Sequence, residues 1–194
     1  MISQSLLDRR PIVVALAGPN GAGKSTFFHA YLTKTGLYFV NADVLALSLG
    51  MQAYDAAKMA DALRRQLVEQ RESFIFETVF SDPLGEKLEF LVETERSGYT
   101  VLLVFIGIPD ASISEQRVAM RASRGGHDVP VDKLVQRFPR TMKNLKHALS
   151  VLSNVCVYDH SDFDRGYHLI AKIEGGDGIK LHEPVPDWFR NLLP

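Results

Sequence analysis

The fold is decided by the stretch Gly18-Pro19-Asn20-Gly21-Ala22-Gly23-Lys24-Ser25, which Thr26 follows. This stretch matches the phosphate-binding pattern G-x-x-x-x-G-K-[ST] without a mismatch. Just before it, Ile12 to Ala17 form a short continuous apolar run, which is typical of a buried parallel strand. Just after it, the composition from Ser25 to Leu32 favours a helix. The motif therefore lies between a strand and a helix, where its mechanism requires it.

This placement predicts a site for a nucleoside triphosphate. Glycines allow successive backbone N–H groups to turn toward an anion, and the helix that follows directs its positive end at the same place. We expect the Lys24 ammonium to contact the β- and γ-phosphates and the Ser25 hydroxyl to bind Mg²⁺. The predicted nucleotide-binding residues are Gly18, Pro19, Asn20, Gly21, Ala22, Gly23, Lys24, Ser25, Thr26 and, from a later helix, Arg121.

Length and composition indicate one globular domain spanning residues 1–194. Hydrophobic residues make up 46% of the chain and charged residues 23%, as in ordinary soluble proteins. The 22 Lys and Arg residues balance 23 Asp and Glu residues, for a net charge of −1. This balance favours neither nucleic acid nor an anionic membrane as a partner, so any positive site must be local.

The remaining composition argues against several other classes of protein. Cys156 is the single cysteine, which excludes an intrachain disulfide. The first ten residues lack the apolar region of a signal peptide, and no apolar run approaches a membrane span, so we expect a cytoplasmic protein. No His or Cys spacing predicts a metal cage, and no G-x-S-x-G motif predicts a serine hydrolase.

Apolar runs alternate with helical patterns along the chain. After the first strand, strands are predicted at Leu37–Val40, Phe74–Phe76, Thr100–Ile108 and Val155–Tyr158, and helices at about 55–72, 82–98, 112–121 and 134–145. This alternation predicts a three-layer α/β/α fold of the P-loop NTPase and kinase type, with a mostly parallel sheet of about five strands. Thr100–Ile108 carries no charge and should be the central strand.

The tail, about 168–194, should add an edge strand and a helix. Ile170 to Glu174 is the candidate edge strand. Trp188, Phe189, Leu192 and Leu193 share one helical face, and we expect this face to dock on the domain rather than bind a partner.

Four polar residues follow predicted strands, namely Asp43, Glu77, Ser81 and Asp159. Because ligands bind beyond the carboxyl ends of parallel strands, we predict that these four form one site. Asp43 is the candidate general base for an acceptor hydroxyl, and its alternative role is to cap the helix that follows it. Glu77 and Ser81 are candidate acceptor-binding residues. Glu77 could instead help to hold Mg²⁺ through water, or form a structural ion pair.

Arginines flank a Gly-Gly turn between two predicted helices, Arg117, Arg121 and Arg124 before it and Arg137 and Arg140 after it. The glycines and Pro130 predict a hinged helical flap over about residues 112–145. Closing such a flap would bring positive charge to the transferring phosphoryl group. The alternative is a solvated helical face with ion pairs to Glu115 or Asp132. No strong Walker B acid is present, since Asp110 follows its strand late and behind Pro109.

Several segments together resemble the zeta-toxin-like family of small P-loop kinases. The segments that carry the resemblance are the Gly18–Thr26 motif, Asn41-Ala42-Asp43, Phe76-Glu77-Thr78-Val79-Phe80-Ser81, Gly98-Tyr99-Thr100-Val101, Arg117-Val118, Arg124-Gly125-Gly126-His127-Asp128-Val129-Pro130 and Arg137-Phe138-Pro139-Arg140. A vast superfamily shares the first motif, whereas the flap segment and the Glu-Thr-x-x-Ser stretch are far more specific.

The resemblance implies phosphorylation of a small molecule by ATP or GTP with Mg²⁺, the best known acceptor being a sugar hydroxyl of UDP-N-acetylglucosamine. It makes Lys24 and Ser25 the ligands of phosphates and Mg²⁺, Asp43 the base, Glu77 an acceptor-binding acid, and Arg124 and Arg137 the catalytic flap arginines. Arg121 and Arg140 lie one helical turn from those two, so the assignment within the flap stays open.

The predicted function is a small-molecule kinase that transfers the γ-phosphoryl group to a hydroxyl. Two alternatives remain, and they are a nucleotide-binding switch or toxin–antitoxin component that acts through an antitoxin-like protein, and an ATPase without an acceptor. None of these hypotheses involves nucleic acid or a membrane.

Overall fold

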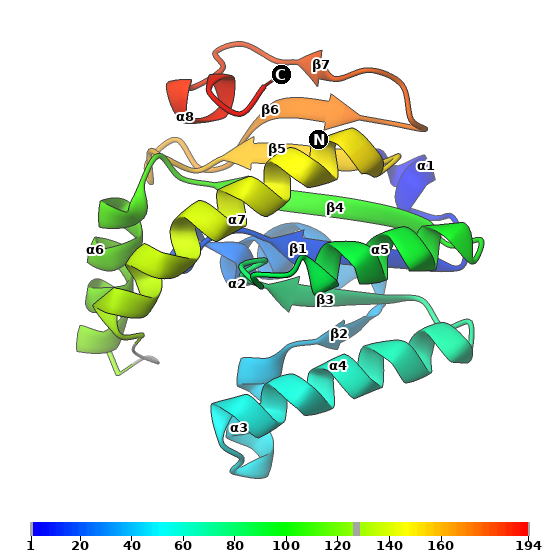
Figure 1. Cartoon of the computed structure of the whole chain (residues 1–194), viewed down its shortest axis with the longest axis horizontal. Coiled ribbons are helices and arrows are strands. Elements are labelled where there is room, and N and C mark those ends of the chain that lie inside the picture. The colour runs from blue at the N-terminus through cyan, green and yellow to red at the C-terminus, as the bar shows by residue number, and fades with distance from the viewer. Residues whose placement is uncertain (1, 126–128, 194) are drawn as a thin grey trace.

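The computed structural model describes residues 2–125 and 129–193 of the chain. Within them, a seven-stranded sheet has the order β2-β3-β1-β4-β5-β6-β7 (Figure 1). Gly126, His127 and Asp128 of the predicted flap lie outside the described residues.

The first five strands confirm the predicted parallel sheet. They are β1 (Ile12–Ala17), β2 (Tyr38–Val40), β3 (Phe74–Thr78), β4 (Thr100–Gly107) and β5 (Val155–Asp159). All pair in parallel, and β4 is the central strand as predicted. The predicted strand count was too low, because β6 (His168–Ile173) and β7 (Lys180–Leu181) extend the sheet in antiparallel fashion. The tail strand is therefore not the edge, since β7 covers it.

Alternation along the strands divides the core into two layers. Val13, Phe74, Leu103 and Val157 face one side of the sheet, together with buried residues of the helices on that side. Their strand neighbours Val14, Ile75, Leu102 and Cys156 face the other. Both faces are buried along most of β1, β3, β4 and β5, which explains why these strands read as continuous apolar runs.

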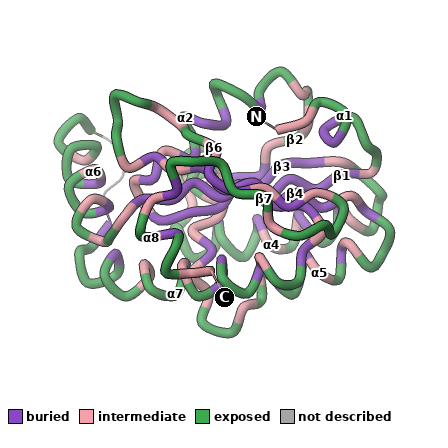
Figure 2. Tube along the Cα trace, turned by 90° about the horizontal axis from the view of Figure 1, so that it is seen from above, coloured by how far each residue is buried: buried purple, intermediate pink, exposed green. Residues whose placement is uncertain are grey.

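Helices cover both faces of the sheet, which completes the predicted three layers (Figures 1 and 2). On one face lie α4 (Ala53–Glu69), α5 (Glu86–Arg96) and α7 (Val131–Val151), and on the other lie α1 (Gln4–Leu7) and α2 (Lys24–Phe27). The helix after the phosphate-binding motif continues as a π-helical turn at Phe28–Leu32 and a 3₁₀ turn at Thr33–Thr35. Figure 2 shows the purple buried strands between these two layers.

The carboxyl ends of the parallel strands are flanked by α3 (Ala42–Leu49) and α6 (Ala111–Ser123). Figure 1 shows α6 beyond the sheet at that end, with the start of α7 beside it. The helices α6 and α7 are the predicted helical arms before and after residues 124–130. The tail helix α8 (Asp187–Arg190) is one turn long, and its Phe189 is fully buried in the core, so the tail docks on the domain as predicted.

None of the helices within residues 2–125 and 129–193 has both the length and the hydropathy needed to cross a bilayer.

Candidate functional site

Lys24 begins α2, directly after the loop of residues 18–23 that leaves β1. Its side chain is only 6% exposed, and Nζ donates hydrogen bonds to the carbonyl oxygens of Gly18 and Pro19, both at 3.0 Å. Burial lowers the pKa of Lys24, while the carboxylates of Glu77 and Asp43 act in the opposite direction. The ammonium is thus held inside the loop, where a phosphate could replace the two carbonyl groups as its partner.

Glu77 lies at the end of β3, next to the loop because β3 pairs with β1. Its Oε2 accepts hydrogen bonds from Ser25 Oγ at 2.9 Å and from Asn41 Nδ2 at 3.1 Å, and its Oε1 lies 3.9 Å from Lys24 Nζ. Of the roles predicted for Glu77, the contact with Ser25 supports the one at Mg²⁺, and the approach to Lys24 is the ion pair of the alternative prediction. Carboxylate and hydroxyl oxygens are ligands that Mg²⁺ accepts, so this pair fits the ion. In the described part of the chain no three His, Cys, Asp or Glu residues form a metal cluster, so phosphate oxygens and water would complete the shell.

Asp43 lies in the first turn of α3 and is exposed. The alternative prediction, that Asp43 caps the helix after it, is wrong. Asn41 Oδ1 is the cap, because it accepts the hydrogen bonds from the backbone N–H groups of Asp43 and Val44. Asn41 therefore both caps α3 and bonds Glu77, which fixes the Asp43 backbone relative to the phosphate loop. The carboxylate of Asp43 is left available to a ligand at the positive end of the helix.

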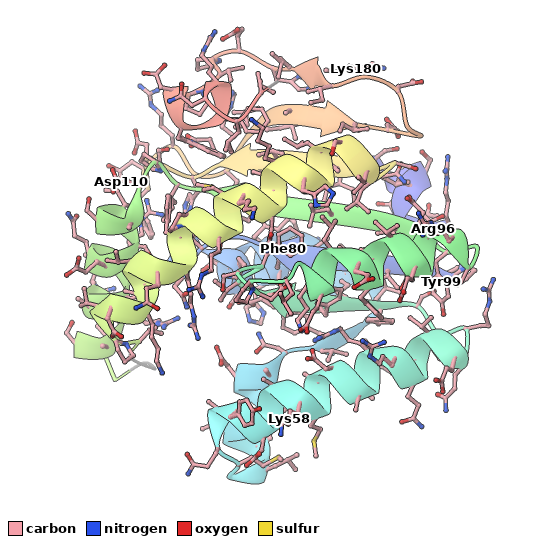
Figure 3. All side chains as sticks on the ribbon, viewed as in Figure 1. Lys58, Phe80, Arg96, Tyr99, Asp110 and Lys180 are labelled. Carbon is pink, nitrogen blue, oxygen red and sulfur yellow. The ribbon has the colours of Figure 1, made fainter. Side chains whose placement is uncertain are left out.

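Ser81 belongs to a segment that follows β3 and that α7 holds in place. Thr141 Oγ1 donates to the carbonyl of Val79 at 2.9 Å, and Asn144 Nδ2 donates to the carbonyls of Phe80 and Asp82 at 3.0 and 3.1 Å. Phe80, labelled in Figure 3, is buried and has a positive φ of 61°. These bonds to a helix keep an irregular segment in one conformation beside the site.

Two cavities meet at the carboxyl end of the sheet. The first, of about 1210 Å³, is lined by the phosphate loop, α6 and the connection after β5. The second, of about 530 Å³, is lined by Asp43, Ser81 and parts of α4 and α7. Glu77 and Arg121 line both cavities. The two cavities thus share a wall, and we call them the loop cavity and the α4 cavity.

Positive side chains gather around the α4 cavity, namely Arg64, Lys87, Arg121, Arg137 and Arg140. Arg64 is buried, and this burial lowers its pKa to about 10. Asp61 pairs with both Arg64 and Lys87, and the Lys87 ammonium lies 2.9 Å from each carboxylate oxygen. Asp61 thereby holds two cations at the wall of the α4 cavity. The same wall also carries four carboxylates, those of Asp43, Asp61, Glu77 and Asp82, so its five cations are largely balanced.

The five predicted flap arginines divide between the two cavities. Arg117 and Arg121, on α6, and Arg124, directly after this helix, line the loop cavity. Arg137 and Arg140, on α7, line the α4 cavity together with Arg121. The two arms therefore carry their arginines mainly toward different cavities. Arg121 is the member that lies at the junction.

Two acidic residues have structural roles. Asp159, predicted to share the site with Asp43, Glu77 and Ser81, is instead bonded by Trp188 Nε1 at 2.7 Å and by Ser161 Oγ, and it lines neither cavity. That prediction was wrong, because the tail helix covers the end of β5. Asp110, labelled in Figure 3, caps α6 by accepting hydrogen bonds from the N–H groups of Ser112 and Ile113.

Comparison with protein families shows to which family the chain belongs. The model of the zeta toxin family matches residues 48–168, well over half of the 194 residues. The chain belongs to the zeta toxin family. The match begins after the phosphate loop and Asp43, so those residues support the P-loop assignment independently of it.

Solved structures agree with this fold. A chain of the crystal structure of AvrRxo1-ORF1:-ORF2 with ATP is 18% identical with a TM-score of 0.74, over 95% of this chain and 64% of that chain. A chain of the PezAT chromosomal toxin-antitoxin system of Streptococcus pneumoniae is 15% identical with a TM-score of 0.54, over 86% and 81%. A putative kinase from Chloroflexus aurantiacus is 18% identical with a TM-score of 0.51, over 67% and 80%. No curated protein matches the chain.

These likenesses show a P-loop kinase-like fold for this member of the zeta toxin family. The chain spans 64% of the length of the AvrRxo1 complex chain that it matches.

Sequence analysis missed several residues of this zeta toxin family site. Asn41 carried a usable signal, because Asn directly before an apolar helical run is a typical N-cap. Arg64, Asp61 and Lys87 gave none, since a helical pattern identifies a face but not its partner across the fold. Thr141 and Asn144 look like ordinary polar positions of a long helix.

Proposed function

We propose that the chain is a phosphotransferase that moves the γ-phosphoryl group of ATP to a hydroxyl group of a small molecule. The observation that carries this proposal is the meeting of the two cavities at Glu77 and Arg121, beside Lys24. A donor in the loop cavity and an acceptor in the α4 cavity would approach each other at this junction. Catalysis by such a site depends mainly on positioning and on charge compensation.

On the donor side, the loop amides and Lys24 would bind the phosphates. Arg121 and Arg124 would compensate charge that builds up on the transferring group. The nucleobase would lie toward Met120 and Phe163, which are 56% and 74% exposed and line the same cavity. These apolar side chains offer a stacking surface without distinguishing ATP from GTP.

Ser25 Oγ and Glu77 would hold Mg²⁺ together with the phosphates. When bound, Mg²⁺ supplies positive charge to the β- and γ-phosphate oxygens. Glu77 keeps the Ser25 hydroxyl oriented toward the ion's position through their hydrogen bond.

On the acceptor side, we propose Asp43 as the general base. It lies on the wall of the α4 cavity and would accept the proton of the acceptor hydroxyl as phosphoryl transfer proceeds. Glu77, Ser81 and Arg137 would orient the acceptor. Arg137 and Arg140 on the wall of the α4 cavity favour an acceptor that itself carries phosphate, and membership of the zeta toxin family supports a UDP-activated amino sugar.

Phosphorus NMR of the purified protein with ATP, Mg²⁺ and a panel of UDP-sugars tests this proposal. We expect a new phosphomonoester signal with the correct acceptor. Lys24→Ala should abolish both ATP binding and turnover, and tight ATP binding by this variant would show that the loop is not the site. Asp43→Asn should keep ATP binding and lower turnover by about 10²- to 10⁴-fold, the usual contribution of a general base.

The matched control for Asp43→Asn is Asp55→Asn, which removes an exposed carboxylate from the first turn of α4, outside both cavities. Turnover of the control should equal that of the wild type. Equal turnover of Asp43→Asn and its control would exclude Asp43 as the base. Hydrolysis without any acceptor-dependent product would favour an ATPase.

A second candidate function is a nucleotide-dependent component of a toxin–antitoxin pair. It is favoured by two similar structures, one of an ORF1:ORF2 assembly and one of a toxin-antitoxin system. It predicts a small protein, encoded beside this chain, that inhibits turnover by covering the loop cavity. Co-expression with the product of the neighbouring reading frame, followed by an ATP-binding assay, tests it.

A further inference from the structure

The carbonyl oxygens of the phosphate loop show an unusual regularity. All six, from Gly18 to Gly23, lie within hydrogen-bond distance of a side-chain donor. Lys24 bonds the first two, as described above. Each of the other four has a donor from outside the motif, Ser114 Oγ for Asn20 at 2.7 Å, Arg117 Nη1 for Gly21 at 3.5 Å, His160 Nδ1 for Ala22 at 2.7 Å and Tyr167 Oη for Gly23 at 2.6 Å.

We propose that Ser114, Arg117, His160 and Tyr167 are positioning residues that brace the loop through its carbonyl groups. Arg117, His160 and Tyr167 also line the loop cavity. A peptide unit whose carbonyl is fixed outward directs its N–H group to the opposite side, where an anion can collect several such groups. The brace therefore prepares the loop for phosphate before any ligand arrives. This inference rests on the proposed function only for its consequence, which is tighter nucleotide binding.

His160 is the most constrained of the four. It is 5% exposed, and because a carbonyl oxygen can only accept, its Nδ1 must carry the proton that bonds Ala22. Arg117 therefore cannot donate to Nδ1, and its Nη2 donates instead to the carbonyls of His160 and Ser161 at 2.9 and 3.1 Å. The His160 ring stacks on the Tyr167 ring with centroids 4.2 Å apart. The two loop donors from the β5–β6 connection thus support each other.

Tyr167 explains a glycine of the motif. Gly23 has a φ of 94°, and a Cβ at this residue would lie 2.8 Å from Tyr167 Oη and 2.9 Å from the His160 ring. A side chain there would displace both donors. Burial raises the pKa of Tyr167, so its hydroxyl stays protonated and can donate at neutral pH.

Ser114 and Arg117 extend the brace to α6. Ser114 is 1% exposed, and both residues lie in the first half of the helix. The start of α6 is therefore fastened to the loop, whereas Arg121 and Arg124 lie beyond the fastened part.

The test compares Tyr167→Phe, which removes only the hydroxyl, with Tyr31→Phe. Tyr31 contacts the same aromatic cluster, and its hydroxyl makes no hydrogen bond within the described residues. Hydrogen exchange of the ligand-free full-length chain should show faster exchange at residues 21–25 in Tyr167→Phe than in Tyr31→Phe. Equal exchange in the two variants would overturn the brace.

ATP binding by calorimetry gives the second readout. We expect Tyr167→Phe and His160→Leu each to weaken ATP binding by about tenfold, the equivalent of one lost hydrogen bond, with turnover at saturating ATP largely kept. His160→Asn, whose side-chain amide can still donate to Ala22, should restore most of the affinity. Equal weakening in the Asn and Leu variants would exclude a donor role for His160. If the wild type bound no ATP, the proposed function would fail while the exchange comparison still decided the brace.

Discussion

At the scale of a single residue, Glu77 contacts three polar side chains of the candidate site. One carboxylate contacts the Ser25 hydroxyl, the Asn41 amide and the Lys24 ammonium. A neutral amide at this position would keep the shape of the side chain and lose its charge. Replacing Glu77 by Gln therefore tests its proposed role in metal and phosphate binding while leaving the packing of the side chain unchanged.

Glu77→Gln should raise the Mg²⁺ concentration needed for half-maximal turnover by about tenfold or more, as expected for a residue that orients a metal ligand. Removing the carboxylate also removes an influence that raises the pKa of Lys24. Titration of turnover with Mg²⁺ measures the effect, and Glu69→Gln, an exposed carboxylate at the end of α4, is the control. An unchanged Mg²⁺ dependence would leave Glu77 with the acceptor role alone.

His160 should make stability depend on pH. Burial, together with the charge of Arg117, lowers the pKa of His160 below its ordinary 6.5, although the Ala22 carbonyl and Asp159 oppose the shift. Below pH 6.5 the unfolded chain therefore binds a proton that the native chain does not, so the free energy of unfolding falls as the pH falls. Urea unfolding at about pH 7.5 and about pH 5.5 measures it. His160→Asn should lose less stability over this interval than the wild type, and an equal loss would contradict the assignment.

At the scale of elements, each strand delivers its polar residues to one edge of the sheet. This much follows from the sequence, because an apolar run predicts a strand and its last residues must reach the carboxyl edge. Glu77 and Asp43 were predicted for this reason, and they do line the α4 cavity. Asp159 shows where the inference ends. Its strand was predicted correctly, but no local pattern indicates that a tail helix far along the chain will bond the carboxylate.

The contact of α7 with the segment after β3 is likewise invisible in the sequence. The spacing of Thr141 and Asn144 marks one face of a helix, whereas their acceptors at Val79, Phe80 and Asp82 are separated from them by more than sixty positions. Local periodicity carries no information on such pairs. The positive φ of Phe80 is equally unpredictable, since the residue type disfavours it.

Asn144→Leu tests this connection between elements. It leaves the carbonyls of Phe80 and Asp82 without their donor in a buried setting, which should lower the free energy of unfolding by about 1–3 kcal/mol. Acceptor affinity should fall as well, because Ser81 lies between those two residues. Urea unfolding measures the first effect, and Lys143→Gln, an exposed neighbour on α7, is the control. Equal stability of the two variants would show that other contacts hold the segment.

For the whole molecule, the tail helix joins the carboxyl ends of β4 and β5. Trp188 packs on Gly107 at the end of β4, where an added Cβ would lie 2.1 Å from Cη2 of the indole ring. Its Nε1 bonds Asp159 at the end of β5, and the next residue, His160, bonds the phosphate loop. The tail is thus connected to the phosphate loop through Asp159 and His160, although it lines neither cavity.

Gly107→Ala should displace Trp188 and loosen the tail. Since Trp188 is the single tryptophan of the chain, its fluorescence reports the displacement directly. We expect a red-shifted emission, easier quenching by acrylamide and a loss of about 1–3 kcal/mol in the free energy of unfolding, the usual cost of overpacking. Gly178→Ala is the matched control, because a Cβ at Gly178 meets no atom within 4 Å. Identical emission from the two variants would mean that the indole does not rest on Gly107 in solution. Weaker ATP binding in Gly107→Ala alone would show that the tail supports the phosphate loop through Asp159 and His160.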